Sequence, residues 1–293
     1  MLSGIVREGL AHPASDGAQV YLLKVPRPER AIVTSSPASR RLATICLTLG
    51  CLATPALAQR FSGFRIPVPE PETRLTPYDG RLVFARLKYT TAPGGFYYRG
   101  LPAWAHGYPR AETNLMRIMA EVSAVKLHAD ASNVLALDDP QLMKFPVSYM
   151  TEVGYWTLND KEAAGLRAYL AKGGFVIFDD SRGAQAWSNF EANMKRVIPG
   201  VRFFDLTPAH PIFHSFFEIN SFSIIPQKYD GGLPVMKGIY EDNDPRKRLI
   251  AMINFNTDVS DFWEFSGTGM SIIAEDNEAY KLGVNYVVYA LTH

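Results

Sequence analysis

The stretch that decides the fold is GGFVIFDDSRG, residues 173–183. Its apolar run, residues 175–178, has too little polar alternation for a half-exposed strand and predicts a strand buried on both faces. The preceding segment, residues 160–172, predicts a helix, with Thr157 and Asp160 as a capping-box-like start and Gly173 at its end. Asp179 and Asp180 follow the strand directly, so they either cap the next helix or form the floor of a site.

The same alternation of strand and helix continues along the chain. Strand patterns occupy residues 82–87, 133–137, 146–151, 201–206 and 249–255, and helix patterns occupy residues 112–127, 186–197 and 279–290. Such alternation predicts an α/β domain whose mostly parallel sheet carries helices on both faces. Ligands of these sheets bind outside the carboxyl ends of the strands, where the aspartate pair is expected.

The first 58 residues differ in character from the rest. Two arginines at 40–41 precede an apolar run, residues 42–58, that ends in a small-residue cleavage pattern and predicts a signal peptide. The run is short for a membrane span; an uncleaved anchor, a buried helix and lipidation at Cys51 are the alternatives. We expect translation to begin after residues 1–38, a Pro-rich linker at residues 59–78, one domain at residues 79–293, and a periplasmic or secreted protein without a membrane span after cleavage.

Composition excludes several functional classes. The formal net charge is +1, and no basic cluster indicates a nucleic-acid partner. Both cysteines, Cys46 and Cys51, lie in the predicted signal. A mature chain would therefore contain no cysteine nucleophile, thiolate ligand or disulfide.

Seven motifs in order resemble one bacterial family, the domain-of-unknown-function family 4159, over about residues 79–293. The motifs are FARLKY (84–89), YPRAETNL (108–115), FPVSYMTEVG (145–154), LRAYLAKGGFVIFDD (166–180), HPIFHSFFEI (210–219), INFNTDVSDFWEF (253–265) and AYKLGVNYVVYALTH (279–293). The resemblance implies a flavodoxin-like three-layer sandwich similar to class I glutamine amidotransferases. In those enzymes the turn that corresponds to Phe178–Ser181 carries a cysteine nucleophile, which this chain lacks. The resemblance brings no established activity.

Three groups of polar residues are candidate site residues. Asp179 and Asp180 can bind a cation, bind sugar hydroxyls or act as a base, and Glu152 is expected at the same end of the sheet. His210 has His214 and Glu218 at helical spacing, but Pro211 argues against a helix through it, so we predict no metal ion and no cofactor. Each residue also has an ordinary structural alternative, as a cap, a turn or a solvated charge.

Two further segments contribute candidate ligand contacts. Around residues 253–265, Asn254, Asn256, Asp258 and Trp263 combine amide, carboxylate and indole groups, which suit a polyhydroxylated ligand. The long loop at residues 88–110 is rich in aromatic residues, including Trp104, and either forms a lid or packs on the sheet edge.

Two functions from different classes follow. The first is a non-catalytic cell-envelope module that binds a protein or saccharide. The alternative is a hydrolase of an envelope carbohydrate or peptide that uses a cleft formed by Asp179, Asp180 and His210, with Glu152 as a further acid or base.

Overall fold

The computed structural model describes residues 73, 75–97, 100–223, 225–226 and 232–293. The predicted signal peptide and the segment that precedes it, together residues 1–58, lie outside the described residues. Thr76, near the end of the predicted linker, exchanges two hydrogen bonds with the Asn133 side chain, at 2.7 and 2.9 Å. No helix among the described residues is long and apolar enough to cross a membrane.

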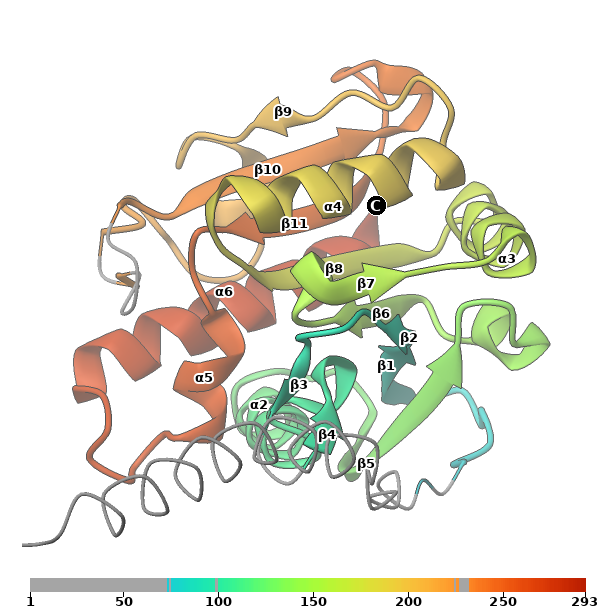
Figure 1. Cartoon of the computed structure of the whole chain (residues 1–293). Coiled ribbons are helices and arrows are strands. Elements are labelled where there is room, and N and C mark those ends of the chain that lie inside the picture. Colours follow the sequence, from blue (N-terminus) through green and yellow to red (C-terminus); the bar gives the residue numbers. More distant parts are fainter. Residues whose placement is uncertain (1–72, 74, 98–99, 224, 227–231) are drawn as a thin grey trace, which may run out of the picture. The chain divides into compact units, whose positions relative to one another are not determined.

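The described residues form a seven-stranded, mostly parallel sheet (Figure 1). Its order is β5 (Leu127–Ala136), β1 (Leu82–Lys88), β6 (Val147–Met150), β8 (Phe175–Ser181), β11 (Leu249–Phe255), β10 (Val235–Tyr240) and β9 (Phe204–Asp205). The first five are mutually parallel, whereas β10 and β9 extend the edge in antiparallel fashion. In chain order the parallel strands read 2-1-3-4-5, an order compatible with a flavodoxin-like fold.

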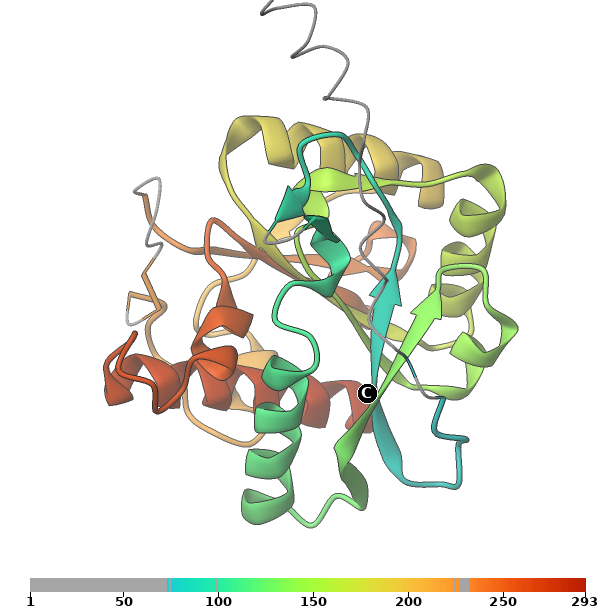
Figure 2. The same ribbon diagram turned by 60° about the horizontal axis from the view of Figure 1, so that its bottom comes forward.

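Helices cover both faces of this sheet. They are α2 (Arg110–Val122), α3 (Asp160–Ala171), α4 (Gly183–Val197), α5 (Val259–Glu264) and α6 (Ile273–Thr292). Side chains of α3 and α4 join one hydrophobic cluster, and those of α2, α5 and α6 join the other. Figure 2 shows α2 and α6 on one side of the strands and α3 and α4 on the other.

Strand β8 shows why the predicted strand is buried on both faces. Phe175 and Ile177 belong to the cluster that contains α2, α5 and α6, and Val176 and Phe178 belong to the cluster that contains α3 and α4. Because alternate side chains of a strand point to opposite faces, an apolar run was needed here. The α/β class and the mostly parallel sheet are thereby confirmed.

Shorter elements connect the layers. Two ribbons pair β2 (Thr90–Thr91) with β7 (Trp156–Thr157) and β3 (Phe96–Tyr97) with β4 (Leu101–Pro102). Single 3-10 turns are η2 (Ala103–Ala105), η3 (Pro140–Lys144), η4 (Val153–Tyr155), η5 (Pro211–His214) and η6 (Glu241–Asn243).

The structure corrects the predicted start of helix α3. Asn159, not Thr157, is the N-cap, and it forms a capping box with Glu162 rather than with Asp160. Thr157 instead lies in the β7 ribbon, where its hydroxyl donates to the Thr90 carbonyl. Two-residue shifts of this kind arise because Thr and Asn both suit the N-cap position, and the ribbon decides between them. The predicted end of the helix is confirmed, since Gly173 follows it with a φ of 104°.

Candidate functional site

Three adjacent parallel strands end in the same unusual backbone conformation. Glu152 follows β6, Asp180 lies at the end of β8, and Asn256 follows β11; their φ angles are 52°, 49° and 60°. Left-handed backbone is uncommon for residues other than glycine, and such residues cluster at functional sites. These three strands are neighbours in the sheet, so the carboxyl edge is where a site is best sought.

Asp179 has a structural role at this edge. Its Oδ1 accepts hydrogen bonds from Asn254 Nδ2 (3.0 Å) and the Val259 amide (3.2 Å). Its Oδ2 accepts from the Tyr149 hydroxyl (2.8 Å) and the Ser260 amide (2.9 Å). Burial raises the pKa of Asp179, although these four bonds favour its charged form. The expected cap of the next helix is therefore not formed, because α4 has no side-chain cap. Asp179 instead accepts from the first amides of α5.

Asp180 faces away from its neighbour. Its side chain is fully buried, and neither carboxylate oxygen has a hydrogen-bond partner among the described residues. His106 Nδ1 lies 3.5 Å from Oδ2, and Arg182 Nε lies 3.2 Å from Oδ1. Asp180 also lines a pocket of about 440 Å³ together with Glu152, Gly154, Tyr155, Arg182, Gln185 and Ala186. Adjacent aspartates of one strand thus serve different faces, which corrects the expectation that they share a site.

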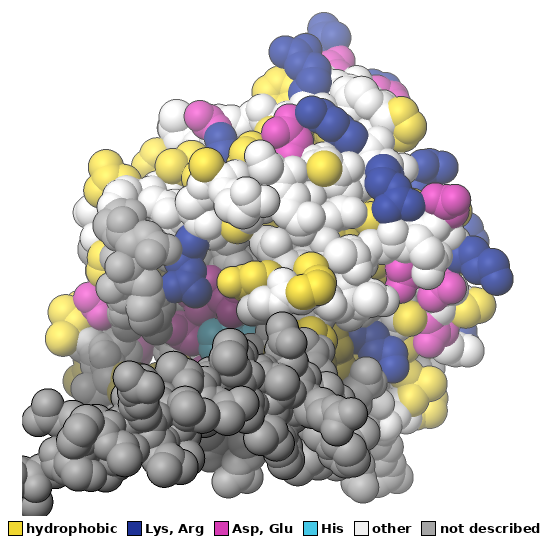
Figure 3. Space-filling view, in the orientation of Figure 1, with side chains coloured by type: hydrophobic (Ala, Val, Ile, Leu, Met, Phe, Trp, Pro, Cys, Tyr) yellow, Lys and Arg dark blue, Asp and Glu magenta, His cyan; other side chains and the backbone are white. Residues whose placement is uncertain are grey.

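His106 is the centre of an acidic cluster, by which we mean Glu152, Asp180, Asp258 and Asp261 around this imidazole. Its Nδ1 lies 3.4 Å from Glu152 Oε1, and its Nε2 lies 3.8 Å from Asp261 Oδ1. Ligand atoms of two trios lie within 4.8 Å of one another: His106 with Glu152 and Asp180, and His106 with Asp258 and Asp261. Figure 3 shows acidic side chains and a histidine gathered in a hollow of the surface.

Crowding of like charges perturbs the cluster. Burial and the charge of Glu152 raise the pKa of Asp180 to about 7. Burial and the charges of Asp180 and Asp261 raise the pKa of Asp258 well above its usual range. Burial alone would lower the pKa of His106, but the neighbouring carboxylates of Asp180 and Glu152 raise it to about 11. The cluster therefore crowds carboxyl groups around one imidazole, and a bound cation would relieve the repulsion between them.

Arg86 fixes the loop that carries His106. This buried arginine of β1 forms an ion pair with Glu112 of α2. Its Nη1 donates to the carbonyls of Trp104 (2.9 Å) and His106 (2.7 Å). His106 was not predicted because no neighbouring motif marks it. The signal that could have found it was the length of the loop at residues 88–110, for which a lid and packing on the sheet edge were both open.

His210 does not join the cluster. Its Nε2 lies 2.9 Å from the Tyr240 hydroxyl, and its Nδ1 accepts from the Ile212 amide. Tyr240 pairs with Leu249 at the start of β11, the end of the sheet opposite to Asn256. The predicted cleft of Asp179, Asp180 and His210 is therefore wrong. His214 and Glu218 do meet, at 2.5 Å, but on the exposed surface.

Several predicted ligand contacts are interior groups. Trp104 and Trp263 are buried in the two hydrophobic clusters, and Trp263 donates to the Ala279 carbonyl. Asn254 is buried between Asp179 and the Tyr286 hydroxyl. Asn256 donates to the Leu233 carbonyl, so of this group only Asp258 reaches the acidic cluster. Glu152 lies at the predicted end of the sheet.

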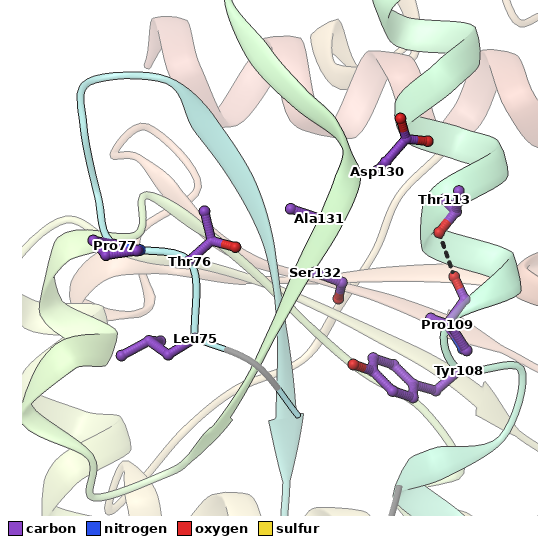
Figure 4. A pocket seen from close by; sticks show the side chains of 9 residues that line it. All are labelled: Leu75, Thr76, Pro77, Tyr108, Pro109, Thr113, Asp130, Ala131 and Ser132. Carbon is purple, nitrogen blue, oxygen red and sulfur yellow. Dashed lines mark hydrogen bonds between the residues drawn. The ribbon is translucent and has the colours of Figure 1, made fainter. Parts of the chain in front are cut away.

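A second pocket, of about 500 Å³, lies beside strand β5 and the start of α2 (Figure 4). It is lined by Leu75, Thr76, Pro77, Tyr108, Pro109, Thr113, Asp130, Ala131 and Ser132. Only Asp130 and Tyr108 of these side chains ionise, so this pocket lacks the convergent acid–base groups found at Asp180.

The comparisons with known proteins agree with the resemblance read from the motifs. The pattern of the domain of unknown function DUF4159 matches residues 83–291, which include every element of the main sheet from the second residue of β1 onward. No match was found among curated proteins. The chain therefore belongs to the DUF4159 family.

Proposed function

We propose that the protein is a hydrolase whose centre is Asp180, with Glu152 as its partner and His106 between them. One observation carries the proposal. Asp180 stands in a strained strand-to-helix turn, is buried, and turns two oxygens without hydrogen-bond partners among the described residues toward His106 and a pocket. A buried carboxylate without such partners is costly unless a ligand or water completes it.

The two carboxyl groups suit general acid–base catalysis. Oxygens of Glu152 and Asp180 lie within 4.8 Å of each other, so both reach one substrate bond. One carboxylate takes a proton from water as the water oxygen attacks the substrate carbon. The bond to the leaving group breaks, and the second carboxyl group gives that group its proton. His106 Nδ1 lies against both carboxyl groups and orients them.

The pocket supports a polar substrate. Its volume of about 440 Å³ falls within the range of small-molecule sites. Arg182 and Gln185 offer hydrogen-bond donors, and the exposed ring of Tyr155 offers a stacking surface. Together with the predicted export signal, this favours a carbohydrate or peptide of the cell envelope and a periplasmic or secreted protein.

The finer fold assignment supports the same position. We propose a flavodoxin-like three-layer sandwich of the amidotransferase-like superfamily, on the evidence of the 2-1-3-4-5 strand order and the helices on both faces. Ligands of such folds bind at the carboxyl ends beside the first and third parallel strands. Here these strands are β1 and β6, which lead to His106 and Glu152. Asp180 stands in the turn that holds the nucleophile in amidotransferases.

A non-catalytic envelope module that binds a protein or saccharide is the second candidate. The observation that favours it is the complete burial of the Asp180 side chain, together with the absence of cysteine from the predicted mature chain. In that case the pocket binds its ligand without turnover.

The test is hydrolysis of isolated envelope glycans and peptides, followed by mass spectrometry. We expect products that have gained one water, and a loss of about 10²–10⁴-fold in rate for Asp180→Asn and Glu152→Gln. Asp205→Asn, which removes an exposed charge that does not line the pocket, is the matched control and should retain full rate. Binding of a glycan or peptide without any product would reject the hydrolase in favour of the second candidate.

A further inference from the structure

The two nitrogens of His106 face different carboxylates. Nδ1 lies 3.4–3.5 Å from Glu152 and Asp180, whereas Nε2 lies 3.8 Å from Asp261 Oδ1. Histidines that bind metals usually donate the second ring N–H to a carboxylate, which fixes the tautomer and the ring orientation. Glu152 and Asp180 can accept such a hydrogen bond from Nδ1–H. Nε2 is then left as a ligand on the side of Asp258 and Asp261.

Asp258 presents one oxygen to that side. Its Oδ1 caps α5, accepting from the Ser260 hydroxyl (2.9 Å) and the Asp261 amide (3.0 Å). Its Oδ2 is buried and has no hydrogen-bond partner among the described residues, and the residue as a whole is only 7% exposed. Ligand atoms of His106, Asp258 and Asp261 lie within 4.8 Å of one another, so a small contraction brings them around one ion.

The charges favour this side of the ring over the other. Arg182 already places a guanidinium 3.2 Å from Asp180 Oδ1. No lysine or arginine in the described part of the chain forms an ion pair with Asp258. Asp258 is therefore a buried carboxyl group with an oxygen that no described residue partners, and a cation bound there would offset the cost of its burial.

We propose that His106 Nε2, Asp258 and Asp261 bind one divalent cation. One imidazole and two carboxylates suit Zn²⁺ or Mn²⁺. The inference deepens the proposed function, because a cation there would act as a Lewis acid beside Asp180 and Glu152. Its test measures binding rather than turnover, so either proposal can fail without the other.

The experiment is calorimetric titration of the chelator-treated full chain with ZnCl₂ and, separately, MnCl₂. We expect one ion per chain for the wild type. Asp258→Asn should weaken binding by more than about 100-fold, because it removes a ligand. This variant should still fold, since Asn caps a helix as well as Asp does. Glu152→Gln should weaken binding by about 10-fold, as expected of a partner that only orients the histidine.

Histidine variants complete the design. His106→Gln should abolish high-affinity binding. His214→Gln is the matched control, because His214 also contacts a carboxylate, Glu218, but on the exposed surface; it should bind as the wild type does. The proposal is overturned if the wild type binds neither ion, if only His214→Gln loses binding, or if Glu152→Gln abolishes binding while Asp258→Asn leaves it unchanged.

Discussion

The adjacent aspartates should respond in opposite ways to the same substitution. In Asp179→Asn the NH₂ group can take the place of Oδ2. The Tyr149 hydroxyl can then turn and accept a hydrogen bond from it. The Ser260 N–H, which lies 2.9 Å from Oδ2 in the wild type, loses its acceptor. Placed at Oδ1, the amide would face two donors, Asn254 Nδ2 and the Val259 N–H. The first arrangement is therefore preferred, and it leaves one buried donor unsatisfied.

An unsatisfied buried N–H costs about 1–3 kcal/mol. The remaining hydrogen bonds also weaken, because they lose a charged acceptor, while the neutral amide recovers part of the cost of burying a charge. We expect a net loss of about 2 kcal/mol in the free energy of unfolding. For a domain of this size that loss lowers Tm by about 4–8 °C.

Urea unfolding followed by circular dichroism measures this difference, with Asp180→Asn as the matched control. Asp180 accepts no hydrogen bond among the described residues and lies beside the charge of Glu152. Its replacement should leave stability unchanged or raise it by about 1 kcal/mol, since removing the charge beside Glu152 and its burial cost offsets the lost ion pairs with His106 and Arg182. If Asp179→Asn proved as stable as the wild type, or Asp180→Asn the less stable of the two, the division of roles between the aspartates would be refuted.

Three further predictions concern the surroundings of the site. Gly154→Ala should cost about 1–3 kcal/mol in urea unfolding, because a Cβ there would lie 2.5 Å from that of Ala186; unchanged stability would contradict the tight contact of η4 with α4. Arg86→Met should lower the free energy of unfolding by about 3–5 kcal/mol, because it leaves Glu112 buried and unpaired. Adding Glu112→Gln to this variant should restore part of that loss. Burial lowers the pKa of His210. Its contribution to stability is therefore present above the unfolded pKa of about 6.5 and is lost as pH falls through the folded pKa. His210→Gln should flatten the decline of Tm below pH 6.5, and an unaltered decline would refute this.

The fold was largely predictable because its signals are local. The unbroken apolar run at residues 175–178 predicted a doubly buried strand, and residues 249–255 form β11 with the predicted bounds. Strand β5 was predicted too short because its first residues, 127–132, are only partly buried at the sheet edge and lack a clear apolar alternation. A strand at the edge of a sheet is less buried, so its sequence shows a weaker apolar pattern.

The site was less predictable because it depends on which way side chains point. Adjacency in sequence suggested that Asp179 and Asp180 act together, yet strand geometry sends them to different layers. His210 looked suitable by spacing, but the antiparallel β10 carries Tyr240 and its histidine partner to the far end of the sheet. Spacing alone cannot report strand direction, and that direction decided the outcome.

His106 illustrates how several weak local features combine into one site. Arg86 of β1 holds the histidine's loop through its carbonyl, and the same guanidinium stacks over Tyr149, whose hydroxyl binds Asp179. Asp179 in turn accepts from the first amides of α5, the helix capped by Asp258. The buried network on one face thus fixes both His106 and Asp258, which lie more than 150 residues apart. Asp179 therefore helps to hold in place the acidic cluster that Asp180 meets on the other face of the sheet.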